Sequence, residues 1–166
     1  MLNKKIEKAM NSQLNAEAYS GYLYWSMSAA LEDMGLRGFA HWMRVQSNEE
    51  LDHARKFYHH IIERGGRVKL TAIDSPPTEW KGVLPMMEET LAHEEKVTAL
   101  IHDLMDLAIA EKDHAAAVFL QWFVSEQVEE EANASEIIQQ LKMGGDAKGP
   151  LLMLDRQLAK RKAEED

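Results

Sequence analysis

Residues 48–56 read NEELDHARK, and they lie inside a segment whose apolar residues recur at helical spacing, from Phe39 to Phe57. Such spacing is typical of a helix with one buried face. Glu50 and His53 fall on the same face as those apolar residues. A charged group is costly to bury unless it is paired or binds a metal. The stretch therefore predicts a helix whose buried face carries polar groups that need a partner.

Helical periodicity extends over most of the chain, and strand-like alternation is almost absent. The expected helices cover about 5–34, 37–64, 83–111, 113–142 and 147–161. The polar tail KRKAEED, which starts at Lys160, is expected to fray. The sequence therefore predicts an all-α protein with a single domain over residues 1–166.

The lengths of the connections predict how the helices are arranged. The first and third connections have only a few residues, which makes each flanking pair of helices an antiparallel hairpin. The second connection has about 18 residues and could span about 60 Å when extended. That length is sufficient to make the third helix parallel to the second. We therefore expect a four-helix bundle with one long crossover and a short fifth C-terminal helix.

The composition argues against several classes of protein. There is no cysteine, which excludes disulfides, thiolate metal sites and cysteine nucleophiles. The net charge of −9, from 28 acidic and 19 basic residues, argues against nucleic acid as the main partner. No apolar run approaches the roughly 18 residues of a membrane span, and the N-terminal residues lack the apolar region of a secretory signal. We expect a cytoplasmic protein with no nucleic-acid or membrane partner.

Each of the four long helices has one glutamate in the middle of its apolar stripe. These glutamates are Glu17, Glu50, Glu94 and Glu130. Glu17 lies 18 residues before the turn at Gly35, and Glu50 and His53 lie 15 and 18 residues after it. Glu94 and Glu130 lie 18 residues before and after the second turn, near residue 112. Equal offsets in a hairpin mean equal height, so we expect the four glutamates to meet in one layer at mid-bundle.

Four carboxylates in one buried layer repel one another strongly. Protonation of some of them would relieve the repulsion, but two bound divalent metal ions are the more economical solution. His53 adds a nitrogen ligand on the same face as Glu50. Oxygen-rich ligands with few imidazoles suit iron or manganese better than a structural zinc. The layer therefore predicts a di-metal carboxylate site.

The chain resembles the ferritins over nearly its whole length. The resemblance is carried by this layer and by the stretches NAEAYSGYLYWSM (15–27), GFAHWMRVQSNEELDHA (38–54), ERGGRVKL (63–70) and FLQWFVSEQVEEEA (119–132). Many ferritin-like bundles have Glu-x-x-His on two helices, whereas the fourth helix here has Gln127 and Glu130 and no histidine, as in the non-haem ferritins of prokaryotes. The neighbours of the motif on the second helix are Leu51 and Asp52, not the haem-binding methionine of bacterioferritins, so no haem is expected.

The resemblance implies a di-iron ferroxidase centre and its ligands. The ligands are Glu17, Glu50 and His53 for one iron, and Glu50, Glu94 and Glu130 for the other, with Gln127 close by. Glu50 would thus bridge the two ions. Tyr24 resembles the tyrosine near this centre in ferritins. The other interpretation is a core residue whose hydroxyl bonds a ligand carboxylate, and the two roles are compatible.

Similar prokaryotic ferritins have a third, weaker iron site that faces the interior cavity. The matching positions are Glu49, Glu126, Glu129 and the shared Glu130. The alternative is a solvated acidic face, because the run of glutamates at 129–131 is ordinary on a surface. The remaining histidines, His93 among them, are predicted to be surface or interface residues.

The function that this resemblance implies is iron storage and detoxification. Fe²⁺ would be oxidised by O₂ or H₂O₂ and kept as a ferric mineral inside a hollow cage of 24 copies. One alternative is a di-iron enzyme of another class, such as a peroxidase or oxygenase, which predicts a substrate pocket and no mineral. The other is a metal-buffering or purely structural bundle, which predicts no oxidation.

Overall fold

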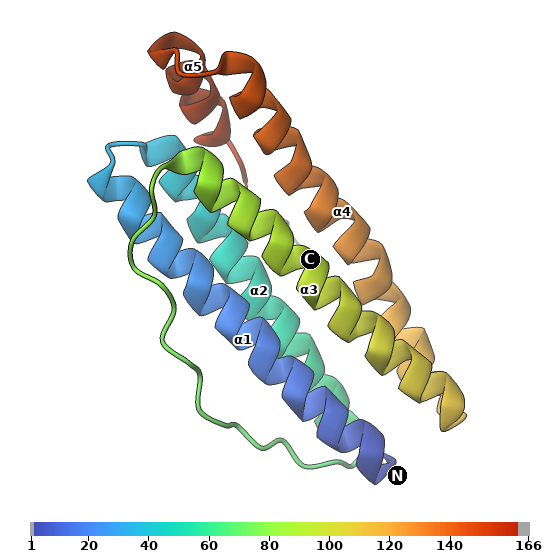
Figure 1. The fold of residues 1–166 in the computed structure, drawn as a ribbon. Helices are drawn as coiled ribbons and strands as arrows, with labels where there is room; N and C mark the ends of the chain where they lie inside the picture. Colours follow the sequence, from blue (N-terminus) through green and yellow to red (C-terminus); the bar gives the residue numbers. More distant parts are fainter. Residues whose placement is uncertain (1, 163–166) are drawn as a thin grey trace.

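The computed structural model describes residues 2–162 and contains five helices in that range (Figure 1). The helices are α1 (Lys4–Asp33), α2 (Arg37–Glu63), α3 (Val83–Ala110), α4 (His114–Gly144) and α5 (Lys148–Leu158). Their number and order are as predicted, and their ends lie within three residues of the predicted ones. None of these helices is long and apolar enough to cross a membrane.

Helices α1 and α2 form one antiparallel hairpin and α3 and α4 form the other, as the short connections predicted (Figure 1). The long connection from α2 to α3 runs along α1. Asn11 Oδ1 accepts a hydrogen bond of 2.6 Å from the Lys69 backbone N–H, and Asn15 Nδ2 donates to a backbone carbonyl at 3.3 Å. Further along, the Ser26 hydroxyl donates to the Pro77 carbonyl at 2.6 Å. The crossover therefore travels the length of the bundle and starts α3 parallel to α2.

The apolar core is divided into two clusters along the bundle axis. One cluster includes Leu31, Phe39 and Met43, and it lies at the end where α1 turns into α2. The other includes Phe57 and Phe123 and lies toward the opposite end. Along each of the four long helices, the mid-helix glutamate falls between residues of the two clusters. The apolar packing thus encloses a polar layer from above and below.

Helix α5 is attached to the beginning of α2. The Asp155 side chain accepts hydrogen bonds from the backbone N–H groups of Gly38 and Phe39, at 2.8 and 2.9 Å. A carboxylate is favourable there, because the first N–H groups of a helix have no partner within it. The backbones approach so closely that a Cβ atom on Gly38 would lie 1.6 Å from the Asp155 carbonyl oxygen. Only glycine therefore fits at this position.

Candidate metal centre

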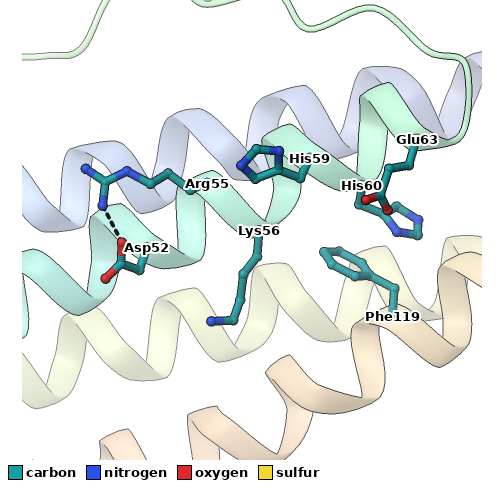
Figure 2. A pocket seen from close by; sticks show the side chains of 7 residues that line it. All are labelled: Asp52, Arg55, Lys56, His59, His60, Glu63 and Phe119. Carbon is teal, nitrogen blue, oxygen red and sulfur yellow. Dashed lines mark hydrogen bonds and ion pairs between the residues drawn. The ribbon is translucent and has the colours of Figure 1, made fainter. Parts of the chain in front are cut away.

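An open hollow of about 410 Å³ lies on the surface beside α2 and α4 (Figure 2). Some of its side chains contact one another: Asp52 pairs with Arg55, and the His60 ring stacks on Phe119 with centroids 4.0 Å apart. Among residues 2–162, only two groups of three side chains bring potential metal-ligand atoms within 4.8 Å of one another. Neither group lies in this hollow. The hollow is therefore not a metal centre.

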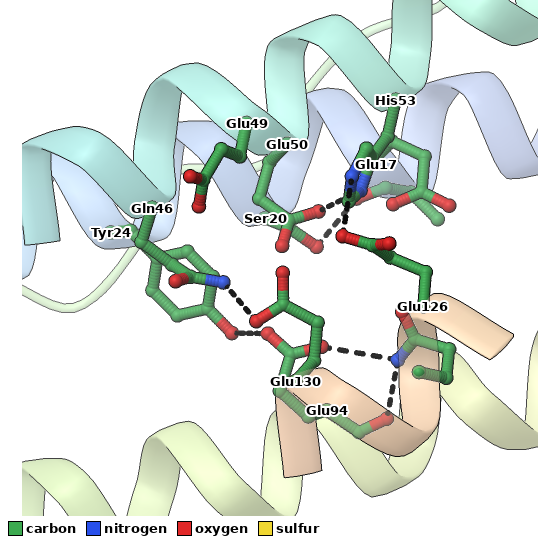
Figure 3. A network of polar contacts seen from close by, with 12 residues as sticks. Glu17, Ser20, Tyr24, Gln46, Glu49, Glu50, His53, Glu94, Glu126 and Glu130 are labelled. Atoms are coloured by element: carbon green, nitrogen blue, oxygen red, sulfur yellow. Dashed lines mark hydrogen bonds and ion pairs between the residues drawn. The ribbon is translucent and has the colours of Figure 1, made fainter. Parts of the chain in front are cut away.

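The polar layer brings together the four glutamates that the sequence singled out (Figure 3). Each of the four long helices contributes one of them. Glu17, Glu50 and Glu94 are each 1% exposed, and Glu130 is 4% exposed. Four carboxyl groups are thus held in the interior of one bundle, where water cannot screen their repulsion.

The first ligand group joins Glu17, Glu50 and His53. One ligand atom from each lies within 4.8 Å of the other two, and His53 Nδ1 is 3.4 Å from Glu50 Oε2. Within residues 2–162, Oε2 of Glu17 and Oε1 of Glu50 are buried and accept no hydrogen bond. Buried acceptors are almost always satisfied in native proteins. A cation would satisfy both, so the residues present fit a metal ion.

The second ligand group joins His53, Glu126 and Glu130. His53 Nε2 lies 3.7 Å from Glu126 Oε1. Glu126, which the resemblance assigns to a third iron site, thus approaches the histidine of the main layer. Glu49 and Glu129, the other two positions assigned to the third site, belong to neither ligand group. Glu49 forms an ion pair with Arg161, and Glu129 is exposed. A ligand role for Glu49 and Glu129 stays a prediction.

Glu94 belongs to neither group and is held by two neighbours (Figure 3). The buried Tyr24 hydroxyl donates a very short hydrogen bond to its Oε1. Gln127 Nε2 donates to its Oε2 at 3.2 Å and to its backbone carbonyl at 3.3 Å. Burial and the negative charges of Glu94 and Glu50 raise the pKa of Tyr24 well above its ordinary value, so the hydroxyl keeps its proton. Tyr24 is therefore a core tyrosine bonded to a carboxylate, and its role at the metal centre stays a prediction.

The metal-free layer retains protons. Burial raises the pKa of Glu17, Glu50 and Glu94, and burial together with the charge of Glu94 raises that of Glu130 to about 8. Burial lowers the pKa of His53, but the carboxylates of Glu126 and Glu50 outweigh it and raise the value to about 11. Divalent cations would take the place of these protons, since metal ligands must be deprotonated.

Three polar side chains at the layer were not among the predicted site residues. Gln13 Nε2 donates to Glu17 Oε1 at 2.8 Å, and Gln46 Nε2 donates to Glu130 Oε2 at 2.5 Å. Gln46 was detectable, because it lies seven residues before His53 on the same buried stripe. Arg161 Nη1 donates to Gln46 Oε1 at 2.7 Å. Nothing in the sequence indicated this contact, since the tail from Lys160 was predicted to fray; residues 163–166 of that tail lie outside the described range.

His93, which was predicted to be a surface or interface residue, is partly buried and lies beside the layer. Its Nε2 lies 2.8 Å from the Ser20 hydroxyl, and its ring packs edge-on against the Tyr24 ring, with centroids 5.8 Å apart. Burial lowers the pKa of His93 to about 4, with a contribution from the charge of Lys96. His93 is thus a neutral, partly buried neighbour of the layer.

Comparisons with known proteins agree with this geometry. The ferritin-like domain family matches residues 7–144. A bacterial non-heme ferritin of Bacteroides fragilis (strain 638R) is 45% identical over 161 residues, which are 97% of this chain and 100% of that protein. One from Staphylococcus saprophyticus is 40% identical over 165 residues, 99% of each chain. Among solved structures, an open pore ferritin from the archaeon Archaeoglobus fulgidus superposes with a TM-score of 0.97 at 49% identity, covering 98% of this chain and 100% of that one.

The relatives extend over essentially the whole chain, and their fold has the same order of helices. The identities of 40–49% are too high for a likeness of fold alone. The similarity includes the helices that carry the polar layer, since the family match begins in α1 and ends at the last residue of α4. The chain therefore belongs to the ferritin family, and within it to the non-haem iron-storage ferritins of prokaryotes.

Proposed function

We propose that this chain oxidises Fe²⁺ at the buried carboxylate layer and stores the ferric product as a mineral inside a hollow assembly of 24 copies. The observation that carries the proposal is the layer itself, with four glutamates and one histidine enclosed between two apolar clusters. In a purely structural bundle, buried carboxyl oxygens without hydrogen-bond partners would only destabilise the fold. Large exposed apolar side chains, such as Trp25 at 63%, support contacts between copies.

In this proposal iron is the substrate. The proposed ligands are Glu17, Glu50 and His53 for the first ion and Glu50, Glu94 and Glu130 for the second, with Gln127 beside the second ion. Glu50 serves both ions, and its position between Glu17 and Glu94 supports this (Figure 3). The proximity of Glu126 to His53 supports a further cation position on the α4 side of the layer.

The chemistry proposed for the layer is a paired one-electron oxidation. Two Fe²⁺ ions lose one electron each, and O₂ takes up both electrons and two protons to give H₂O₂. With H₂O₂ as the oxidant, the same two electrons and two protons give two molecules of water. The carboxylates stabilise the more highly charged Fe³⁺ through their own charge. We expect this reaction to take place in the cytoplasm.

The test adds Fe²⁺ to metal-free protein under nitrogen, admits air, and follows the absorbance of the ferric product together with particle size. Wild type should oxidise more than two Fe²⁺ per chain and keep the product in a large soluble particle. Glu50→Ala should oxidise Fe²⁺ at least about tenfold more slowly, because both ions lose a ligand. Glu95→Gln, a change at an exposed neighbour of Glu94, is the matched control.

The same experiment separates the alternatives. Oxidation that stops at two ions per chain would identify a di-iron enzyme of another class. Equal rates in wild type and Glu50→Ala would show that the layer is not the site of oxidation.

A further inference from the structure

Arg161, in the described part of the segment that follows α5, reaches the metal layer with its side chain. Its Nη1 donates to Gln46 Oε1 at 2.7 Å, and its Nη2 donates to Glu49 Oε2 at 2.5 Å. The side chains of Arg161 and Glu49 are only 19% and 15% exposed. A guanidinium that donates to two partners is held more firmly than a single ion pair.

The fold determines where Arg161 lies along α2. Asp155 ties α5 to the first N–H groups of α2, at Gly38. Six residues later the Arg161 carbonyl lies 2.8 Å from His41 Nε2, and the guanidinium lies over the Trp42 ring, 4.6 Å from its centroid. The segment therefore follows the surface of α2 and brings the positive charge beside the layer.

Both partners of Arg161 are connected to proposed iron positions. Gln46 uses its amide N–H₂ to donate to Glu130 Oε2 at 2.5 Å, while its carbonyl oxygen is held by Arg161. Arg161 thus sets which end of this amide faces Glu130. Glu49 is one of the residues that the resemblance assigns to the third iron site, and its carboxylate bonds Arg161 instead.

We propose that Arg161 is a positioning residue of the metal centre. It orients Gln46 toward Glu130 and takes the place of a third cation at Glu49. The inference rests on the proposed function, because it concerns the same layer. A metal ion that uses Glu49 as a ligand then binds only by displacing the guanidinium, so Arg161 weakens the binding of a third ion there.

The test measures Co²⁺ binding to metal-free protein by calorimetry and by the visible spectrum of bound Co²⁺, neither of which depends on oxidation. Wild type should bind two ions tightly and a third weakly. Arg161→Gln should bind the third ion at least about tenfold more tightly, because a cation no longer competes for Glu49. Adding Glu49→Gln to Arg161→Gln should abolish this increase in affinity for the third ion.

Two further variants separate positioning from a general effect of charge. Arg161→Lys keeps the charge but cannot bond Gln46 and Glu49 together, so its third-ion affinity should lie between those of wild type and Arg161→Gln. Arg156→Gln removes the same charge from an exposed position on α5 and should behave as wild type. Helix content and assembly size, measured on every variant, verify folding, and Arg161→Lys carries the test if Arg161→Gln does not assemble.

The outcomes distinguish this inference from the proposed function. Suppose that wild type binds two Co²⁺ ions tightly. The role of Arg161 would then be overturned if the affinity for the third ion were unchanged in both Arg161 variants, or if Arg156→Gln raised it equally. Either result would leave the proposed function intact. Wild type that binds fewer than two ions would overturn the proposed function.

Discussion

Replacing Glu50 by glutamine separates two effects of the buried layer on the free energy of unfolding. Burial of the carboxyl groups lowers it in the metal-free protein, and bound metal raises it. Burial and the charge of Glu94 raise the pKa of Glu50 well above its ordinary value, so the metal-free protein favours the neutral carboxyl. A glutamine side chain has nearly the same shape and no charge. The metal-free variant should therefore be about as stable as wild type, within about 1 kcal/mol.

The metal-bound state should respond very differently. At a free Co²⁺ concentration of 100 times Kd, each occupied site stabilises the folded protein by about 2.7 kcal/mol. Both proposed sites use Glu50, so together they contribute about 5 kcal/mol. A chain of this length shifts its Tm by about 2–4 °C per kcal/mol. Co²⁺ should thus raise the Tm of wild type by about 10–20 °C, and that of Glu50→Gln by a small fraction of this.

The assay is thermal unfolding followed by tryptophan fluorescence, with and without Co²⁺, for wild type, Glu50→Gln and the control Glu95→Gln. The control should match wild type in both conditions, because Glu95 is exposed. If Co²⁺ raised the Tm of Glu50→Gln as much as that of wild type, the metal would bind elsewhere. If the metal-free variant lost several kcal/mol, the carboxyl of Glu50 would have a structural role that the geometry does not show.

Three further predictions concern the layer and its supports. The pKa of Glu130 is raised from 4.5 to about 8, so the folded chain binds this proton more tightly than the unfolded chain. The unfolding free energy of the metal-free protein, measured in denaturant titrations, should therefore fall between pH 4.5 and about 8, by up to about 1.4 kcal/mol per pH unit. A flat profile would contradict this. Tyr24→Phe leaves the buried oxygen of Glu94 without its donor and should cost about 1–3 kcal/mol in the same titrations, with slower Fe²⁺ oxidation by absorbance. Gly38→Ala forces a Cβ against the Asp155 carbonyl and should cost about 1–3 kcal/mol or more in thermal unfolding, whereas unchanged stability would show that α5 shifts freely.

The sequence predicted the layer because its members lie at regular positions on amphipathic helices. A period of seven residues keeps side chains on one face, and equal offsets from a turn place them at equal height. These rules brought out Glu17, Glu50, His53, Glu94 and Glu130 before any contact was known. They do not say which side chain is the partner of which, so the proximity of Glu126 to His53 and the choice of Glu94 as the acceptor of the Tyr24 hydroxyl came only from the structure.

By itself the sequence determined the five helices, the two hairpins, the direction of the crossover and the layer, because these follow from local periodicity and from connection lengths. Only the tertiary structure decided the role of the C-terminal segment. Arg161 contacts Glu49 across 112 positions of the chain, through the close docking of Asp155 on Gly38. No local pattern encodes such a contact, because it depends on how α5 packs on α2. A polar segment that packs back on the bundle has the same sequence pattern as one that frays.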